Sequence, residues 1–291
     1  MSEQQNNVLG AWLMVAVTFI FAMQDGFSRH LAGEYNTFMI IMIRFWFFAA
    51  FVMIVAARKA GGLRNAARSQ VTLAQIFRAA LLSLEILVAV SGFVILGLTE
   101  SHAVFAVYPL LVAALSGPVL GEKVGWRRWV AIGVGFVGVI IILEPGYGVF
   151  NPMALIPFGA ALMFAVYGLM TRWVSRYDSS AVSFFWTGVV GFVVTTAIGV
   201  FHWEPMSGSD WIWMCLLCVT SAFSHFLLIK AYEVAEASAI QPLAYLQLVF
   251  ASAIGMTVFG EVLRPNVALG AAVVVAAGLF TLWRARIAAR R

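Results

Sequence analysis

Three charged residues, Asp25, Arg44 and Glu85, lie deep inside long apolar stretches of this 291-residue sequence. Charged groups are costly in apolar surroundings, so they usually face the interior of a helix bundle or a wet cavity. Asp25 and Arg44 should lie at similar depth on either side of a short loop. They could therefore form a buried ion pair, or contact a zwitterionic solute and take up a proton. Glu85 is a candidate partner for Arg44 or a protonated carboxylic acid.

Other polar side chains in apolar stretches could supply hydrogen bonds. Helix positions three or four residues apart share a face. This spacing groups His102, Phe105 and Tyr108 on one helix and Gln241 with Tyr245 on another. A lone histidine such as His225 is more often a packing residue than a ligand, although it could also face the cavity. Besides the three charged residues, we expect the following residues to contact a substrate: Gln24, His102, Tyr108, Tyr167, His225, Gln241 and Tyr245.

Motifs typical of other functions are weak or missing. The stretch GVGFVG (133–138) fits a dinucleotide fingerprint but has no βαβ context, so helix packing is the better interpretation. Cys215 and Cys218 form a C-x-x-C without further ligands, so we expect neither a metal nor any other cofactor. The sequence contains no H-E-x-x-H, G-x-S-x-G or G-x-x-x-x-G-K-[ST]. We therefore do not expect an enzyme or an ATP-driven pump.

The composition indicates which elements position these residues. The chain is 63% hydrophobic and 11% charged, with a mean hydropathy of +0.95, whereas about a quarter of the residues of a soluble domain are charged. Because hydrocarbon offers no water to backbone polar groups, segments of this kind cross a membrane as helices. We predict an all-α integral membrane bundle of ten transmembrane helices, at residues 8–31, 37–57, 75–98, 102–121, 126–143, 152–173, 181–203, 211–232, 237–260 and 267–286.

The basic residues predict the orientation, because lysine and arginine favour the cytoplasmic side of a membrane protein. With the N-terminus inside, fifteen of the 18 Lys and Arg residues face the cytoplasm, Arg29 and Arg264 face outside, and Arg44 lies within a span. We therefore expect a multi-pass protein of the bacterial inner membrane with both termini in the cytoplasm. The net charge of +5 is then a topology signal and not a sign of nucleic-acid binding.

The two halves of the sequence are similar to each other. FAMQDGFSR (21–29) aligns without a gap with FAVYGLMTR (164–172), so Gln24 and Tyr167 occupy equivalent positions. Both could offer hydrogen bonds to a solute that lies between the halves.

The dipeptide Gly-Glu ends both the fourth predicted helix (121–122) and the ninth (260–261). Five helices precede the central loop and five follow it, and five is odd, so the second copy must enter the membrane from the opposite side. We expect a first five-helix repeat at 1–146 and an inverted one at 147–291. Such repeats can open a midplane site to each side in turn.

With this repeat, the chain resembles the drug/metabolite transporter superfamily, and within it the EamA-like ten-helix exporters. The resemblance covers nearly the whole chain and rests on the doubled unit, on YPLLVAALSGPVLGEK (108–123) and on LQLVFASAIGMTVFGEVL (246–263). Pro109 has Leu248 as its counterpart, so the second copy departs from the family's pattern there. Within the family, the chain looks most like the aromatic amino acid exporters of the YddG type.

The resemblance implies a secondary transporter that exports small amphipathic metabolites, above all aromatic or other hydrophobic amino acids, by alternating access. The alternatives are drugs, nucleotide sugars or other metabolites, and an intramembrane enzyme is less favoured. Phosphorylated sugars would call for more Lys and Arg within the spans. The expected partners are a small-molecule substrate and membrane lipid, with protons as a candidate coupling ion, and the expected state is a monomer or a weak homodimer.

Overall fold

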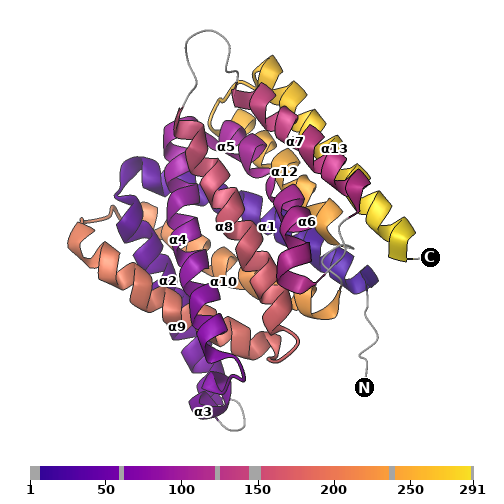
Figure 1. Cartoon of the computed structure of the whole chain (residues 1–291). Helices are drawn as coiled ribbons and strands as arrows, with labels where there is room; N and C mark the ends of the chain where they lie inside the picture. The colour runs from indigo at the N-terminus through magenta and orange to yellow at the C-terminus, as the bar shows by residue number, and fades with distance from the viewer. Residues whose placement is uncertain (1–6, 59–61, 122–124, 144–151, 236–239, 290–291) are drawn as a thin grey trace.

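The computed structural model describes residues 7–58, 62–121, 125–143, 152–235 and 240–289. Every regular element in these ranges is helical (Figure 1), so the all-α prediction is confirmed. The α-helices are α1 (Asn7–Glu34), α2 (Thr37–Arg58), α3 (Gly62–Ala67), α4 (Thr72–Leu96), α5 (Leu98–Phe105), α6 (Tyr108–Leu120), α7 (Trp126–Leu143), α8 (Leu155–Val174), α9 (Ser180–Gly199), α10 (Asp210–Val234), α12 (Leu246–Val258) and α13 (Pro265–Ala289). Three short 3₁₀ helices are η1 (Pro152–Ala154), η2 (Val200–His202) and η3 (Gln241–Tyr245).

Seven helical segments of the described chain are long and apolar enough to cross a membrane: α1, α2, α4, α5 with α6, η1 with α8, α9 with η2, and α10. Shorter apolar helices at Trp129–Ile142, Leu243–Val258 and Pro265–Phe280 occupy the other three predicted spans. The prediction of several spanning helices is thus confirmed, but length and apolar character alone do not establish ten.

One predicted span is broken, and another contains a 3₁₀ segment that continues directly into its α-helix. α5 ends at Phe105 and α6 begins at Tyr108, because Pro109 has no N–H with which to continue the helical hydrogen bonds. α4 ends just before Gly97, whose φ of +84° suits only glycine, so the predicted boundary between the third and fourth spans moves. The described part of the ninth predicted span (237–260) contains η3 followed by α12, and α3 was not predicted.

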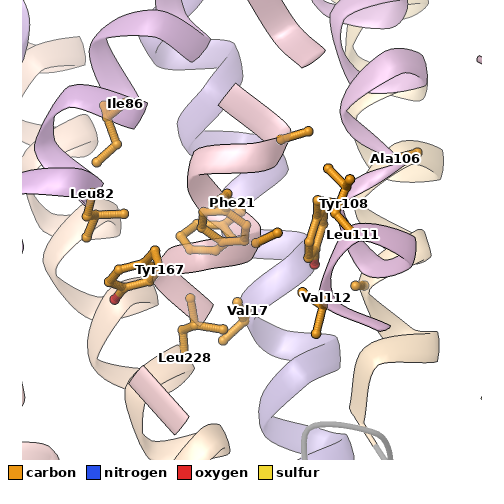
Figure 2. Close-up of a cluster of buried hydrophobic side chains, with 14 of the residues drawn as sticks. Val17, Phe21, Leu82, Ile86, Ala106, Tyr108, Leu111, Val112, Tyr167 and Leu228 are labelled. Atoms are coloured by element: carbon orange, nitrogen blue, oxygen red, sulfur yellow. The ribbon is translucent and has the colours of Figure 1, made fainter. Parts of the chain in front are cut away.

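The helices pack in pairs around a common core. α1 packs against α10 and α12, α8 packs against α4 and α6, and α2 packs against α9. α7 and α13 lie side by side along one edge of the bundle (Figure 1). Buried apolar side chains fill the centre, where Phe21, Tyr108 and Tyr167 belong to one cluster (Figure 2).

The pairing of α7 with α13 depends on glycines. A methyl group on Gly138 would come within 2.8 Å of the carbonyl oxygen of Gly270, and one on Gly270 within 2.5 Å of the carbonyl oxygen of Gly138. A methyl group on Gly135 would come within 2.0 Å of Cδ1 of Leu110, whereas one on Gly133 would meet open space. Helix packing is therefore the confirmed interpretation of this stretch for two of its three glycines.

Candidate functional site

A small cavity of about 50 Å³ lies where α1, α2, α4, α5, α8, α10 and α12 meet. Six of the ten predicted site residues line it, and all six are buried, with no residue more than 8% exposed. The lining residues are Phe21, Gln24, Asp25, Arg44, Glu85, Ile86, Ala89, Val90, Phe93, His102, Phe105, Phe164, His225 and Gln247.

Helical spacing and one helix break position these side chains. On α1, Phe21, Gln24 and Asp25 lie within one turn and share a face, and on α4 Glu85 and Ala89 are one turn apart. His102 comes from α5, the first half of the helix that is broken before α6. Gln247 comes from α12, which follows the 3₁₀ helix η3. Discontinuous helices of this kind contribute to the midplane sites of inverted-repeat transporters.

Asp25 forms hydrogen bonds with two partners. Nε2 of His102 lies 3.0 Å from its Oδ2 atom, and Nε2 of Gln247 donates to the same oxygen at 3.1 Å. The other ring nitrogen of His102, Nδ1, lies 3.0 Å from the carbonyl oxygen of Leu98. A carbonyl oxygen can only accept, so Nδ1 donates. A bare lone pair on Nε2 would be repelled by the carboxylate, so a proton lies between His102 and Asp25.

Arg44 forms a second polar group with α10. Its Nε atom donates to Oγ of Ser221 at 2.5 Å, and its Nη2 atom lies 3.2 Å from Nε2 of His225. A guanidinium can only donate, so Nε2 of His225 accepts and the proton of this ring is on Nδ1. That Nδ1 atom has no hydrogen-bond partner among the described residues.

The predicted ion pair between Asp25 and Arg44 is not present. The two residues line one cavity, but α2 turns Arg44 toward α10 while Asp25 pairs with His102. Glu85 does not pair with Arg44 either. It is 4% exposed, lines the cavity and forms no hydrogen bond or ion pair within the described part of the chain. A carboxyl group and a guanidinium thus face the cavity without neutralising each other directly.

Four phenylalanine rings form an aromatic wall beside these polar groups: Phe21, Phe93, Phe105 and Phe164. The ring of Phe93 stacks on His102 with centroids 5.0 Å apart, and the edge of Phe21 meets His225 at 5.1 Å. Phe105 and Phe164 are 5.5 Å apart. Such rings favour offset or edge contacts with another aromatic group.

Two predicted tyrosines lie behind this wall and not in the cavity. Tyr167 is fully buried in the apolar cluster of Figure 2, with its ring 5.3 Å from the guanidinium of Arg78. Tyr108 packs 5.2 Å from Phe105 and 5.1 Å from Phe164. Tyr167, which the sequence aligns with Gln24, therefore does not line the cavity as Gln24 does.

The remaining two predicted residues come from η3. Tyr245 turns toward α13, where a methyl group on Gly278 would collide with its hydroxyl oxygen. It therefore does not line the cavity. η3 begins at Gln241, but the side chain of Gln241 is outside the described part of the structure.

Sequence reasoning missed three polar residues. Gln247 could have been found, because it is an amide in an otherwise apolar stretch, the same signal that singled out Gln24. Ser221 bonds Arg44, and Ser224 donates to Oε1 of Gln24 at 3.2 Å. Serines within helices commonly bond their own backbone, as Ser224 also does, so no sequence signal marks these two.

At the end of the bundle that carries α3, a buried arginine joins three helices. Arg78, on α4, is 0% exposed. It donates to the hydroxyl oxygens of Thr171 on α8 and Thr187 on α9 at 3.3 Å and 2.9 Å, and to the carbonyl oxygen of Ser183 at 2.7 Å. Arg78 is one of the fifteen basic residues that the sequence assigned to the cytoplasmic side, and the structure buries it between the helices.

At the opposite end, Glu261 joins α1 to α5. Its carboxylate accepts the backbone N–H groups of Leu98 and Thr99, both at 2.8 Å, and Nε of Arg29 at 2.9 Å. The N-terminus of α5 carries a partial positive charge that favours this contact. Burial opposes ionisation of Glu261, but the hydrogen bonds from Thr99, Leu98 and Arg29 outweigh it and hold the pKa of Glu261 below its ordinary value.

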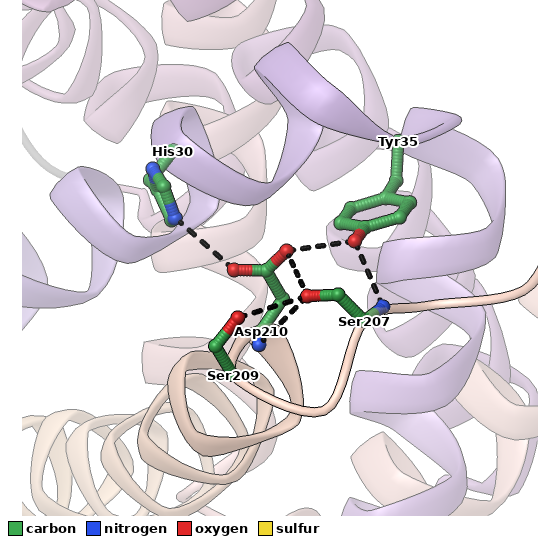
Figure 3. Close-up of polar contacts among 5 residues, drawn as sticks. All are labelled: His30, Tyr35, Ser207, Ser209 and Asp210. Atoms are coloured by element: carbon green, nitrogen blue, oxygen red, sulfur yellow. Dashed lines mark hydrogen bonds and ion pairs between the residues drawn. The ribbon is translucent and has the colours of Figure 1, made fainter.

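A second polar cluster at this end ties α1 to the start of α10 (Figure 3). Asp210 accepts the hydroxyl groups of Tyr35 and Ser207, both at 2.7 Å, and Nε2 of His30 lies 3.6 Å away. Polar contacts therefore hold the helices together at both ends of the cavity.

The volume of the polar cavity, about 50 Å³, is far below the roughly 300–1,000 Å³ of a typical ligand pocket.

A multi-pass helical bundle that encloses a polar cavity between its helices is typical of a membrane transporter. The chain belongs to the EamA-like transporter family, whose model matches residues 8–144 and again residues 151–283.

Individual relatives are similar over almost the whole chain. An S-adenosylmethionine uptake transporter of Rickettsia prowazekii is 25% identical over 272 residues, which cover 94% of this chain and 91% of the relative. A riboflavin transporter of Vibrio cholerae is 28% identical over 291 residues, covering 98% and 97%. A crystal structure 16% identical in sequence, with a TM-score of 0.67, covers 98% of this chain and 99% of its own, which shows a common fold. The relatives do not support the expected likeness to aromatic amino acid exporters of the YddG type.

Proposed function

We propose that this protein carries amphipathic metabolites with a planar heteroaromatic ring across the bacterial inner membrane by alternating access. The observation that carries the proposal is the cavity, in which phenylalanine rings lie beside Asp25, Arg44 and Glu85. The relatives are named for S-adenosylmethionine and riboflavin. Both compounds combine a nitrogen-containing aromatic ring system with a polar chain, which matches an aromatic wall next to polar groups.

In this proposal the two kinds of lining residue have separate roles. The ring of the substrate stacks against Phe21, Phe93 and their neighbours in the wall. The polar chain lies among Gln24, Glu85 and Arg44, which face the cavity from three helices. Glu85 would hold an ammonium or hydroxyl group, and Arg44 a carboxylate or carbonyl oxygen.

Export of aromatic or other hydrophobic amino acids, which the sequence favoured, would use the same wall and the same polar groups. The names of the relatives support the larger heteroaromatic substrates instead, and one of them is named for uptake. We therefore propose uptake of heteroaromatic metabolites as the main activity and keep aromatic amino acids as competitors to be tested.

We further propose that the protein consists of two inverted five-helix repeats, 1–146 and 147–291, with ten spans and both termini in the cytoplasm. In these repeats α1 corresponds to α8, α4 to α10, and α6 to α12. The packing supports this correspondence, because α1 contacts α10 as α8 contacts α4, and α1 contacts α12 as α8 contacts α6. Gly121 and Gly260 also share a left-handed conformation, with φ of 76° and 65°. The family model matches once in each half.

A cavity of about 50 Å³ holds a few waters at most, so a substrate can enter only when one end of the bundle opens. In alternating access the two ends open in turn. Under the proposed orientation, the contacts of Glu261 and Asp210 close the outer end and those of Arg78 close the inner end. The proton between Asp25 and His102 is the coupling ion that we propose, because a substrate in the cavity would compete with it.

The test is a counterflow assay in proteoliposomes with radiolabelled S-adenosylmethionine, riboflavin, phenylalanine and a nucleotide sugar. We expect exchange of the first or second compound, recovered chemically unchanged. Asp25→Asn should reduce exchange by about tenfold or more, since a hydrogen bond to a charged group contributes about 1.5–3 kcal/mol.

The matched control is Glu100→Gln, which removes a carboxylate that pairs with Arg264 away from the cavity. It should leave exchange unchanged. Exchange of phenylalanine alone would reject the proposed substrate class, and conversion of any compound to a product would point to an enzyme instead.

A further inference from the structure

A second cavity of about 560 Å³ lies between α2, α3, α9 and α10, separate from the polar one. Its lining consists entirely of Phe, Val and Ala side chains. The floor is formed by buried residues of three spanning helices: Val52, Ala56, Phe184, Phe185 and Ala222. This space is far larger than the polar cavity and has no group with which to bind a polar solute.

The rim of the apolar cavity faces the surroundings of the bundle. Phe51 and Val55 on α2 are 43% and 36% exposed, and Phe223 on α10 is 53% exposed. α2, α9 and α10 are all candidate membrane spans, so this rim meets lipid. From Phe47 to Ala56 the lining follows ten residues of α2, whose nine steps rise about 14 Å at 1.5 Å per residue. That length is close to half of the roughly 30 Å hydrocarbon core, which is one leaflet.

The end of the cavity at α3 is basic. Ala66 of α3 lines the cavity, and α3 contacts both α2 and α9. Arg58 ends α2, and Arg64 and Arg68 each lie two residues from Ala66 along the chain. All three are exposed, and none of them forms an ion pair with another described residue. Basic pockets between spanning helices bind the head groups of anionic lipids. The apolar cavity is about one leaflet deep and has basic residues in the segments at its α3 end. These two features match the acyl chain and the anionic head group of a phospholipid.

The ring of Phe48 contacts residues of both cavities. Phe48 is 1% exposed, and its ring lies 4.7 Å from that of Phe184 in the apolar cavity and 6.3 Å from that of His225 in the polar one. The two cavities share no lining residue, so binding of a ligand in the apolar cavity can be measured without a transported substrate in the polar one.

We propose that the apolar cavity is a binding site for one anionic phospholipid, with an acyl chain between α2, α9 and α10 and the phosphate at Arg58, Arg64 and Arg68. The inference requires the helices to span a membrane but not the proposed substrate or direction of transport.

Native mass spectrometry of the purified protein tests the proposal, with phosphatidylglycerol and phosphatidylcholine of identical acyl chains as probes. We expect one phosphatidylglycerol molecule to bind more tightly than phosphatidylcholine. Arg58→Gln and Arg64→Gln should each weaken its binding by about fivefold, the equivalent of the roughly 1 kcal/mol that one basic residue contributes at a membrane surface. Arg127→Gln, at the start of α7, is the matched control and should change nothing.

A second variant addresses the acyl chain. Ala56→Phe places a ring on the floor of the cavity and should abolish the one tightly bound lipid, whereas Val137→Phe on the exposed face of α7 should retain it. Equal binding of the two lipids, or full binding by the Arg58→Gln/Arg64→Gln double variant, would overturn the proposal even if Ala56→Phe failed to fold.

Discussion

Two charged side chains in the polar cavity each have hydrogen-bond partners from other helices. Asp25 on α1 is bonded by His102 and Gln247, and Arg44 on α2 by Ser221 and His225. Removing one member of a buried pair usually leaves the other charge uncompensated. Because Asp25 and Arg44 do not pair directly, loss of one does not leave the other without hydrogen bonds.

Tyr245 provides a residue-scale prediction, because it was expected in the site but packs against α13. Its hydroxyl oxygen has no hydrogen-bond partner among the described residues. Tyr245→Phe should therefore keep both transport and thermal stability, whereas Tyr245→Ala should lower the free energy of unfolding by about 3–5 kcal/mol through the cavity it leaves. Thermal unfolding in detergent and counterflow measure the two effects. If Tyr245→Phe loses transport while it remains folded, the hydroxyl belongs to the substrate site after all.

At the scale of helices, the N-terminus of α5 depends on the carboxylate of Glu261. The pKa of this group is held below its ordinary value, so its contacts contribute fully at pH values above the unfolded-state pKa, about 4.3. That contribution is lost as the pH falls through the lower pKa of the folded state.

Glu261→Gln should therefore lower the free energy of unfolding by about 1–3 kcal/mol at neutral pH. The difference from the wild type should shrink below about pH 4.3. Thermal unfolding measured across this range checks the prediction. A difference that is constant between neutral and strongly acidic pH would mean that the ionised carboxylate does not stabilise α5.

The contact between α7 and α13 gives a matched pair of glycine variants. A methyl group at Gly270 would lie 2.5 Å from the backbone oxygen of Gly138, which cannot move without displacing the helix. We expect Gly270→Ala to cost about 1–3 kcal/mol of stability. Gly133→Ala meets open space, so it should be neutral or slightly stabilising, because alanine favours helix more than glycine. Equal melting temperatures for the two variants would contradict the close approach.

At the scale of the whole molecule, the distribution of basic residues predicts which ends of the bundle face the cytoplasm. In a background without Cys215 and Cys218, a cysteine at Gly62 should be shielded from a membrane-impermeant maleimide in intact cells, and one at Ser207 should react. Permeabilised cells, in which both should react, provide the control. The reverse pattern would invert the orientation and exchange the proposed inner and outer ends.

The sequence alone was enough to predict the helical class, the membrane environment and most of the polar residues of the cavity. These follow from local properties, because apolar runs of sufficient length form helices in lipid and buried polar groups in such runs face the interior. Asp25, Arg44, Glu85 and His102 were found in this way. The proposed repeat also aligns Gln24 with Tyr167 in sequence.

Only the tertiary structure decided which of these residues meet. The rotation of each helix about its axis turns Gln24 into the cavity and Tyr167 behind the aromatic wall, although the two align. Likewise, Asp25 pairs with His102, 77 positions along the chain, and not with Arg44. Partner choice depends on how helices distant in sequence pack against each other, and composition and spacing within a single helix carry no information about that packing.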